Sequence, residues 1–570
     1  MTAVAAATPA GAASEGDRLA RSTATISAYT LVSRVTGFGR MFVLAAVVGT
    51  TYLGNTYQAA NSVPNLVFEL FAAGALQAVL VPELIGMTSR RGGDAGRQLA
   101  ALVLGGLLAL FAVVVVVGAV VAPLVARVLF AGAPDSVHAD QVWLGTVFLW
   151  VFLPQVLFYA GGLVATAALN ASDRFAVPAF APAVNNLVVI AAYLLFAWMR
   201  DGKDPSLHLT PAEVAVLAGG TTLGVVAFTS APVASAVRQG LLRRPRFDRR
   251  DHDVRRLARK GAWAGAFLGL VQVLLVVALV LGNTVEGGGT IYQLGFTYFL
   301  LPHALVAVPV LTALYPAMSR AYGAANTEAY MGLVRRAVEA TWVLALPAVA
   351  AMLTLAEPIA RLTLFGQSKG AVDPVAATIV AFAPGLVPYG LFLLLTRAVY
   401  ARGNVRTPTI VHLLGAAVGI AAMLLATVVL HGDARIAGLA AGHSLAYVVA
   451  FVALAAGLWR DVDRAPLARP RVVAGALASA VAAGVVMLAV HLYGLGGDGR
   501  LGAAAQLVVG GGAGLGVYLL GLLVVGVGDP RRLLHPDAAG DEGGAAAAVT
   551  ADADADAGPG GADGPGVPDA

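Results

Sequence analysis

Two arginines, Arg34 and Arg40, lie in the middle of the first long apolar stretch of the sequence, which runs from Thr25 to Gly49. A bilayer core is about 30 Å thick, so about 20 apolar residues span it as a helix. At about 1.5 Å per residue, each arginine is roughly 13 Å from the nearer end of this segment. Burying one such charge costs about 2.5–3.5 kcal/mol on insertion scales. We therefore expect both arginines to face a water-filled cavity, where they can meet an anion.

The composition indicates a polytopic membrane protein. Of the 570 residues, 58% are hydrophobic and 12% are charged, whereas a soluble globular protein has about 25% charged residues. The mean hydropathy is +0.80. The sequence has no cysteine, which excludes disulfides and thiolate metal sites, and it shows no metal-binding motif. The first twenty residues lack the basic region of a secretory signal, so we expect the first apolar segment to be retained.

The sequence predicts an all-α fold with fourteen transmembrane helices. The apolar segments lie near residues 25–49, 59–87, 98–122, 143–170, 177–199, 213–237, 260–283, 291–319, 334–356, 372–402, 407–430, 435–459, 471–493 and 501–527. Many are interrupted by Gly or Pro, which neighbouring helices or water must compensate. Lys and Arg favour the even connections by roughly four to one, which predicts cytoplasmic N- and C-termini.

Three stretches of the sequence carry a family resemblance. The first begins SRVTGFGR at Ser33 and continues NTYQAANSVPNLVFELFAAGALQAVLVPEL. The others are ALNASDRFAVPAFAPAVNNL at 168–187 and RAVYARGNVRTP at 397–408. Together with the helix count, they resemble the MurJ (MviN) lipid II flippases of the multidrug/oligosaccharidyl-lipid/polysaccharide exporter (MOP) superfamily, in a variant of actinobacterial type. The resemblance covers residues 25–527.

The resemblance implies two six-helix lobes that face a central cavity, followed by two helices that form a lipid-facing groove. The expected organisation is a flexible cytoplasmic N-terminus (1–24), an N-lobe (25–237), a basic linker (238–260), a C-lobe (261–459), the groove pair (471–527) and a disordered cytoplasmic tail (534–570). The implied activity is flipping of lipid II, an undecaprenyl-pyrophosphate-linked muropeptide, to the outer leaflet of the bacterial plasma membrane by alternating access.

The implied protein is a transporter rather than an enzyme, and the sequence shows no HExxH, GxSxG or P-loop motif. We expect no cofactor, with energy from the membrane potential or a monovalent cation. The expected partners are lipid II, membrane lipids, and proteins of cell-wall synthesis and division, but no nucleic acid.

The resemblance makes Arg34 and Arg40 the ligands of the pyrophosphate, since guanidinium groups bind phosphate oxygens bidentately. The two are roughly 9 Å apart along a helix axis and about 120° apart around it, so they can line one wide cavity. Further polar candidates for the cavity are Ser33, Asn55, Asn61, Asn65, Glu69, Thr297 and His303, and candidates for structural or secondary roles are Asn185, Asn186 and Arg397.

Some of these residues also fit a purely structural role. Glu69 is a potential partner that would neutralise Arg34 or Arg40, and His303 fits a core histidine. Asn55, Phe68 and Thr297 stand where relatives often carry charge. These departures keep two other functions open, namely export of another polyprenyl-pyrophosphate-linked saccharide and a non-transporting scaffold of the same fold.

Overall fold

The computed structural model describes residues 10–71, 74–248, 251, 272–461, 466–493, 497 and 499–526. Every regular element in these ranges is a helix. The expected tail at 534–570 lies outside the described residues, as do most of the second half of the basic linker and the first part of the seventh predicted segment.

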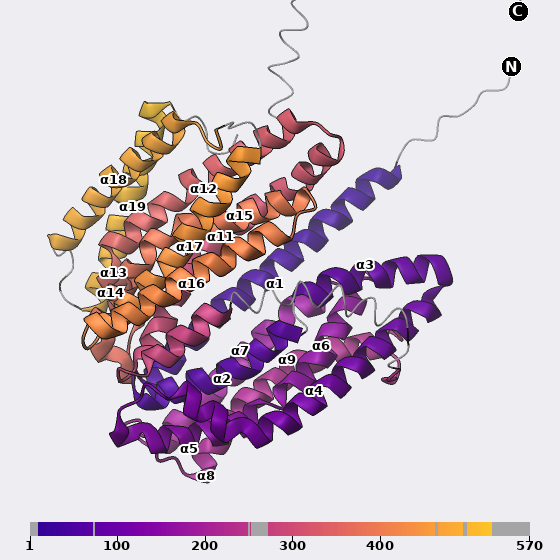
Figure 1. Ribbon diagram of the computed structural model, residues 1–570, viewed down its shortest axis with the longest axis horizontal. Helices are drawn as coiled ribbons and strands as arrows, with labels where there is room; N and C mark the ends of the chain where they lie inside the picture. The colour runs from indigo at the N-terminus through magenta and orange to yellow at the C-terminus, as the bar shows by residue number, and fades with distance from the viewer. Residues whose placement is uncertain are drawn as a thin grey trace, which may run out of the picture.

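The helices form two bundles with α1 (Ala10–Val48) between them (Figure 1). The N-lobe contains α2 (Tyr52–Phe71), α3 (Gly74–Arg91), α4 (Gly93–Leu129), α5 (Asp135–Phe152), α6 (Gln155–Asn170), α7 (Ala176–Arg200), α8 (Pro211–Val214), the π-helix η1 (Ala215–Gly219) and α9 (Gly220–Arg238). The C-lobe contains the helix Gln272–Gly282, α11 (Gly288–Gly323), α12 (Thr327–Thr354), α13 (Ala356–Thr363), the 3₁₀ helix η2 (Gly366–Ala371), α14 (Val372–Phe382), the 3₁₀ helix η3 (Ala383–Gly385), α15 (Leu386–Ala401), α16 (Arg406–Val429) and α17 (Ala434–Asp461). The pair α18 (Pro470–Leu492) and α19 (Arg500–Val525) packs against α12 and α13.

Eleven stretches of the described chain are helical, long and apolar enough to cross a membrane, and each overlaps one predicted segment. The other three predicted segments correspond to α2 with α3, to Gln272–Gly282, and to α11. The protein is therefore a multi-pass, all-helical membrane protein. The first helix begins at Ala10 instead of near Thr25, so part of the segment 1–24 that was expected to be flexible is helical.

Two further predicted segments are each divided into two helices at a proline. Pro154 separates α5 from α6, and Pro384 lies in η3 between α14 and α15. Proline has no backbone N–H and its ring clashes with the preceding turn, so a continuous helix is disfavoured at these points.

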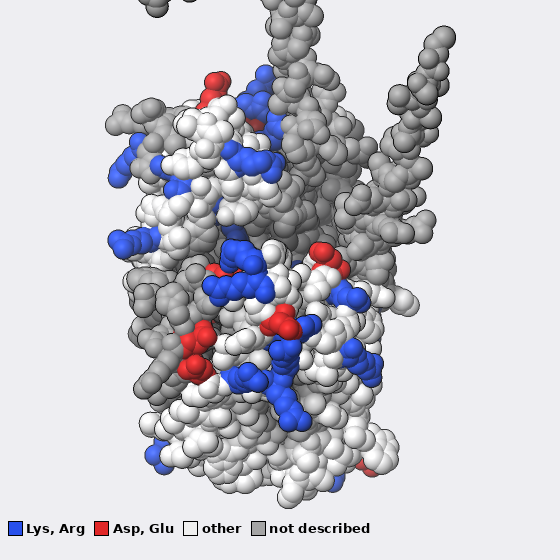
Figure 2. Space-filling view, turned by 90° about the vertical axis from the view of Figure 1, so that its right-hand side faces the viewer, with Lys and Arg blue, Asp and Glu red and all other residues white. Residues whose placement is uncertain are grey.

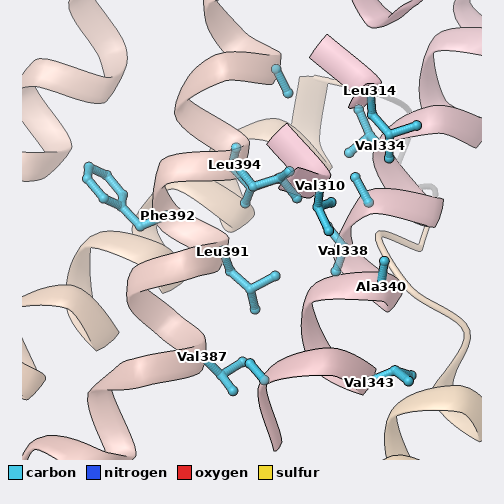
Figure 3. Packing of buried hydrophobic residues seen from close by; sticks show 14 of the residues in the cluster. Val310, Leu314, Val334, Val338, Ala340, Val343, Val387, Leu391, Phe392 and Leu394 are labelled. Atoms are coloured by element: carbon cyan, nitrogen blue, oxygen red, sulfur yellow. The ribbon is translucent and has the colours of Figure 1, made fainter. Parts of the chain in front are cut away.

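The first helix contributes to the cores of both lobes. Leu44 packs in a cluster of N-lobe residues, whereas the next residue, Ala45, packs in a cluster of C-lobe residues. The deeper C-lobe core lies between α11, α12 and α15, where Val310, Val338 and Leu391 are fully or almost fully buried (Figure 3). The lobes are thus packed separately, with α1 as a shared element.

A charged pair fixes α18 to the C-lobe. The carboxylate of Glu339 in α12 has only 2% of its side-chain surface exposed and accepts the Nε and Nη2 groups of Arg469 at 3.0 and 2.7 Å. The backbone N–H of Arg469, the residue before α18, donates to the same carboxylate at 2.8 Å. This carboxylate also raises the pKa of the Arg469 guanidinium, so the arginine stays charged at any working pH.

We expect Arg469→Ala to destabilise the protein by about 2 kcal/mol, because it leaves a buried carboxylate without its charged donor. Thermal unfolding in detergent should show a lowered midpoint. Arg471→Ala is the matched control, since in the described part of the chain this guanidinium donates to the carbonyl of Val525 at an exposed site. Adding Glu339→Gln to Arg469→Ala should restore part of the loss. Equal midpoints for the two single variants would contradict the role of the pair.

Candidate functional site

Of the two arginines Arg34 and Arg40, the first lies in a cavity between the lobes. Arg34 lines a space of about 490 Å³ whose walls are formed by α1 and α7 on one side and α11 on the other. Ser33 and Thr297 line the same cavity. Within the described ranges, no carboxylate is within ion-pair distance of the Arg34 guanidinium. The cavity therefore presents an unneutralised cation, as expected for a site that receives an anion.

The second arginine has different surroundings. Arg40 is absent from the lining of that cavity, and its charge acts on the hydroxyl groups of Tyr57, Tyr159 and Tyr193 in the N-lobe. The hydroxyl of Tyr57 lies 2.7 Å from that of Tyr193 and 2.7 Å from that of Thr221. The structure thus places Arg40 beside a buried group of N-lobe hydroxyls, and only Arg34 beside the cavity.

Glu69 does not neutralise either arginine in the described part of the chain. It is half-buried in α2, and its carboxylate makes no ion pair with either guanidinium among the described residues. One helical turn earlier, Asn65 accepts a hydrogen bond from the hydroxyl of Tyr159 at 3.1 Å. Because Tyr159 also feels the charge of Arg40, Asn65 belongs to the surroundings of Arg40.

His303 lies in α11 near the Arg34 cavity. The charge of Arg34 acts on its ring, which packs on Tyr389 with 4.4 Å between ring centroids. It is buried, as a core histidine would be, but its Nδ1 has no hydrogen-bond partner among the described residues. Thr297, nearly two turns earlier, donates its hydroxyl to the carbonyl of Gln293 at 2.7 Å.

Asn55 differs from the expectation of a cavity residue. Its side chain is 1% exposed, and its Nδ2 group donates to the carbonyl of Val285 at 3.1 Å. Its Oδ1 atom accepts the backbone N–H of Gly289 at 2.8 Å and that of Thr290 at 3.4 Å. These N–H groups belong to the first turn of α11, which has no partners for them within the helix. Asn55 therefore joins α2 of the N-lobe to α11 of the C-lobe.

Of the other amide candidates, Asn186 connects two helices, whereas Asn185 and Asn61 do not in the described part of the chain. Asn186 in α7 donates to the carbonyl of Ser33 and to the hydroxyl of Thr36, both at 3.2 Å, which holds α7 against α1. The Oδ1 atom of Asn185 is buried and has no hydrogen-bond partner in the described chain. Asn61 accepts the Nδ2 group of Asn65 on its backbone carbonyl at 3.0 Å.

Arg397 lies apart from these groups. It is exposed near the end of α15, where its guanidinium carbon is 5.8 Å from the centre of the Tyr315 ring. This placement agrees with a snorkelling side chain that packs its stem on the protein.

Several polar groups near the site carried little signal in the sequence. Tyr57 lies inside the family-like stretch, but Tyr193 and Thr221 are polar residues within apolar helices and were not singled out. In the C-lobe, the hydroxyl of Tyr292 lies 2.5 Å from Nδ1 of His443. Only helix packing brings such residues together, since 136 and 151 positions separate the partners in sequence.

Two helical lobes with a cation-lined cavity between them define a multi-pass membrane protein of the transporter class. The sequence model of the family described as "Lipid II flippase MurJ" matches residues 44–497. The chain therefore belongs to the MurJ family. The matched region begins after Arg34 and Arg40, so membership does not depend on the arginine pair.

Curated relatives and solved structures agree with this membership. The chain is 29% identical over 406 residues to "Lipid II flippase MurJ" of Burkholderia cenocepacia, covering 68% of this chain and 75% of that protein. It is 28% identical over 449 residues to "Probable lipid II flippase MurJ" of Rhizobium meliloti, covering 78% and 81%.

Two solved structures share the fold. One, titled "Lipid II flippase MurJ, inward closed conformation", matches with a TM-score of 0.69 and 18% identity, over 88% of this chain and 98% of that one. The other, an inward-facing multidrug resistance MATE family transporter of the MOP superfamily, matches with a TM-score of 0.58 and 16% identity, over 75% and 96%.

We expect Asn55→Ala to increase the fraction of molecules in which the lobes separate at the contact between α2 and the first turn of α11. A net loss of about 1.4 kcal/mol would increase the open population roughly tenfold. The chain has no cysteine, so Thr290→Cys, at a position that is 2% exposed, gives a unique thiol. Its reaction with a soluble maleimide in detergent should accelerate when Asn55→Ala is added.

Asn55→Asp is the informative control for this measurement. It keeps an acceptor for the first turn of α11 and adds a negative charge, which a helix N-terminus favours, so labelling should stay slower than with alanine. An unchanged rate in Asn55→Ala would show that these hydrogen bonds do not hold the lobes together.

Proposed function

We propose that this protein moves lipid II from the cytoplasmic to the outer leaflet of the plasma membrane by alternating access. The observation that carries the proposal is the exposed guanidinium of Arg34 in a cavity shared by both lobes. Membership of the MurJ family supports lipid II as the substrate, because relatives in the family carry that name.

The chemistry of the cavity suits a diphosphate. A guanidinium group donates two parallel hydrogen bonds to phosphate oxygens, and such bonds strengthen where water is scarce. Gly37 faces this cavity without a side chain, and Pro178 and Pro182 of α7 form part of the same wall. The headgroup would enter here while the polyprenyl chain stays in the lipid.

The distribution of basic residues supports an orientation. Figure 2 shows the end of the molecule at which α3 ends and α4 begins, and Lys and Arg side chains are spread over much of this face. Basic residues are typical of the cytoplasmic side. We therefore assign this end, and both chain termini, to the cytoplasm.

The energy for the movement comes in this proposal from the membrane. A potential that is negative inside assists outward movement of an anionic headgroup by about 2.3 kcal/mol per charge per 100 mV. We propose no cofactor and no enzymatic step, with a monovalent cation as the alternative source of energy. Proteins of cell-wall synthesis and division are the proposed partners.

The lobes must exchange contacts during the cycle. The hydrogen bonds of Asn55 to Val285, Gly289 and Thr290 join them at the end opposite the basic face. Outward opening requires these bonds to break, and rigid rocking of two lobes around a central site achieves that with little change within each lobe.

The decisive variants are Arg34→Ala and Arg40→Ala, expressed in a cell depleted of its own flippase. We expect Arg34→Ala to abolish rescue, because it removes the cation of the cavity, and Arg40→Ala to abolish or strongly reduce it. Arg97→Ala is the control, since Arg97 is a surface residue paired with Asp94. All three must insert at wild-type levels. Rescue by both Arg34→Ala and Arg40→Ala would exclude this mechanism.

Transport of labelled lipid II in reconstituted vesicles separates the remaining alternatives. A flippase should move lipid II, whereas an exporter of another polyprenyl-pyrophosphate saccharide should move that lipid and a scaffold should move neither. Arg34→Lys tests the phosphate contact, because lysine keeps the charge but not the bidentate fork. We expect it to retain binding and lose at least tenfold in transport rate.

A further inference from the structure

A second cavity lies on the outer surface of the N-lobe, away from the interlobe site. It occupies about 460 Å³ between α4 and α5, which pack side by side (Figure 1). One end is polar, with Arg127 and His138, and the walls further along are aromatic, with Trp143 and Trp150. We propose that this groove, called the α4–α5 groove below, binds an anionic glycerophospholipid of the outer leaflet.

The groove lies where one backbone hydrogen bond of α4 is missing. Pro123 lies inside this helix and has no N–H group to donate to the carbonyl of Ala119, four residues earlier. Trp150 of α5 supplies the missing donor, with its indole Nε1 2.9 Å from that carbonyl. The proline thus creates the acceptor, and the tryptophan satisfies it across the helix interface.

This hydrogen bond distinguishes Trp150 from an ordinary tryptophan of the membrane interface. Interfacial tryptophans lie at headgroup level, where their ring is amphipathic. Here the indole N–H group donates to the carbonyl of Ala119, while 51% of the surface of Trp150 remains exposed. The ring is therefore held as a fixed wall. Trp143, two helical turns earlier and 59% exposed, continues the same wall.

The polar end of the groove supplies the charge complementarity. Arg127 is exposed in the last turn of α4, and in the described part of the chain its guanidinium has no recorded hydrogen bond or ion pair. The carboxylate of Asp140, two residues after His138, instead faces His208, with 3.6 Å between its Oδ2 atom and Nε2 of the histidine. A cation left without an acid at the membrane interface attracts anionic headgroups.

His138 completes the headgroup end. Its Nδ1 atom lies 3.0 Å from the carbonyl of Phe130, just beyond the end of α4, and therefore donates to it. This contact fixes the ring and leaves Nε2 for a ligand. The bound lipid would place its phosphate on Arg127 and His138 and one acyl chain along Trp143, Val147 and Trp150. In the proposed orientation this end of α4 is at the outer leaflet.

Tryptophan quenching by brominated lipids tests this assignment. The chain has six tryptophans, and replacing Trp198, Trp263, Trp342 and Trp459 with Phe leaves only the two of the groove. The protein is reconstituted in phosphatidylcholine vesicles that contain increasing fractions of either brominated phosphatidylglycerol or brominated phosphatidylcholine. We expect about fivefold stronger association of the anionic lipid, the equivalent of roughly 1 kcal/mol for one basic residue near the surface.

Variants of Arg127 test whether this residue causes the preference for the anionic lipid. Arg127→Gln should remove the preference, and Arg127→Lys should keep most of it. Arg500→Gln is the matched control, an exposed arginine that donates to the carbonyl of Leu362. Equal quenching by the two lipids, or a preference that survives Arg127→Gln, would overturn the proposal. Stronger competition by lipid II than by phosphatidylglycerol would also overturn it, because the groove would then hold the substrate. Lipid II transport in the same vesicles reports separately on the interlobe cavity.

Discussion

The cost of placing a guanidinium group in hydrocarbon determines the position of α1. A helix that carries Arg34 and Arg40 near its middle cannot face acyl chains on all sides, so it lies where polar groups surround it. α7 holds it through Asn186, and its residues Leu44 and Ala45 join the cores of opposite lobes. The cavity lies between α1, held against α7 of the N-lobe, and α11 of the C-lobe.

The lobe contact near the start of α11 is suited to repeated opening. A Cβ atom on Gly287 would lie 2.2 Å from the carbonyl oxygen of Thr50, and one on Gly366 would lie 2.4 Å from that of Ala46. Both glycines have positive φ, so backbones meet there without side chains between them. The hydrogen bonds of Asn55 to Val285, Gly289 and Thr290 add directional polar contacts to this backbone packing. In the proposed cycle, opening would break these contacts.

Much of the fold was predictable from the sequence because membrane helices are long and apolar. The predicted segments coincide with helices wherever the structure describes them, and Pro154 and Pro384 indicated the breaks within two of them. The depth of Arg34 likewise predicted a cavity. The role of Asn55 was not predictable, because its acceptor and donor groups come from residues more than 225 positions away. Local sequence carries no information about such a contact between lobes.

The separate surroundings of the two arginines follow from helix geometry and have a mechanistic consequence. A spacing of six residues turns the second side chain about 120° from the first, so only Arg34 lines the interlobe cavity while Arg40 lies beside the hydroxyls of Tyr57, Tyr159 and Tyr193. In the proposed mechanism, a headgroup bound to Arg34 would act on a helix whose last turns pack with both lobes, since Leu44 lies in the N-lobe core cluster and Ala45 in the C-lobe one. Binding in the cavity would then be transmitted along α1 to the movement of the lobes.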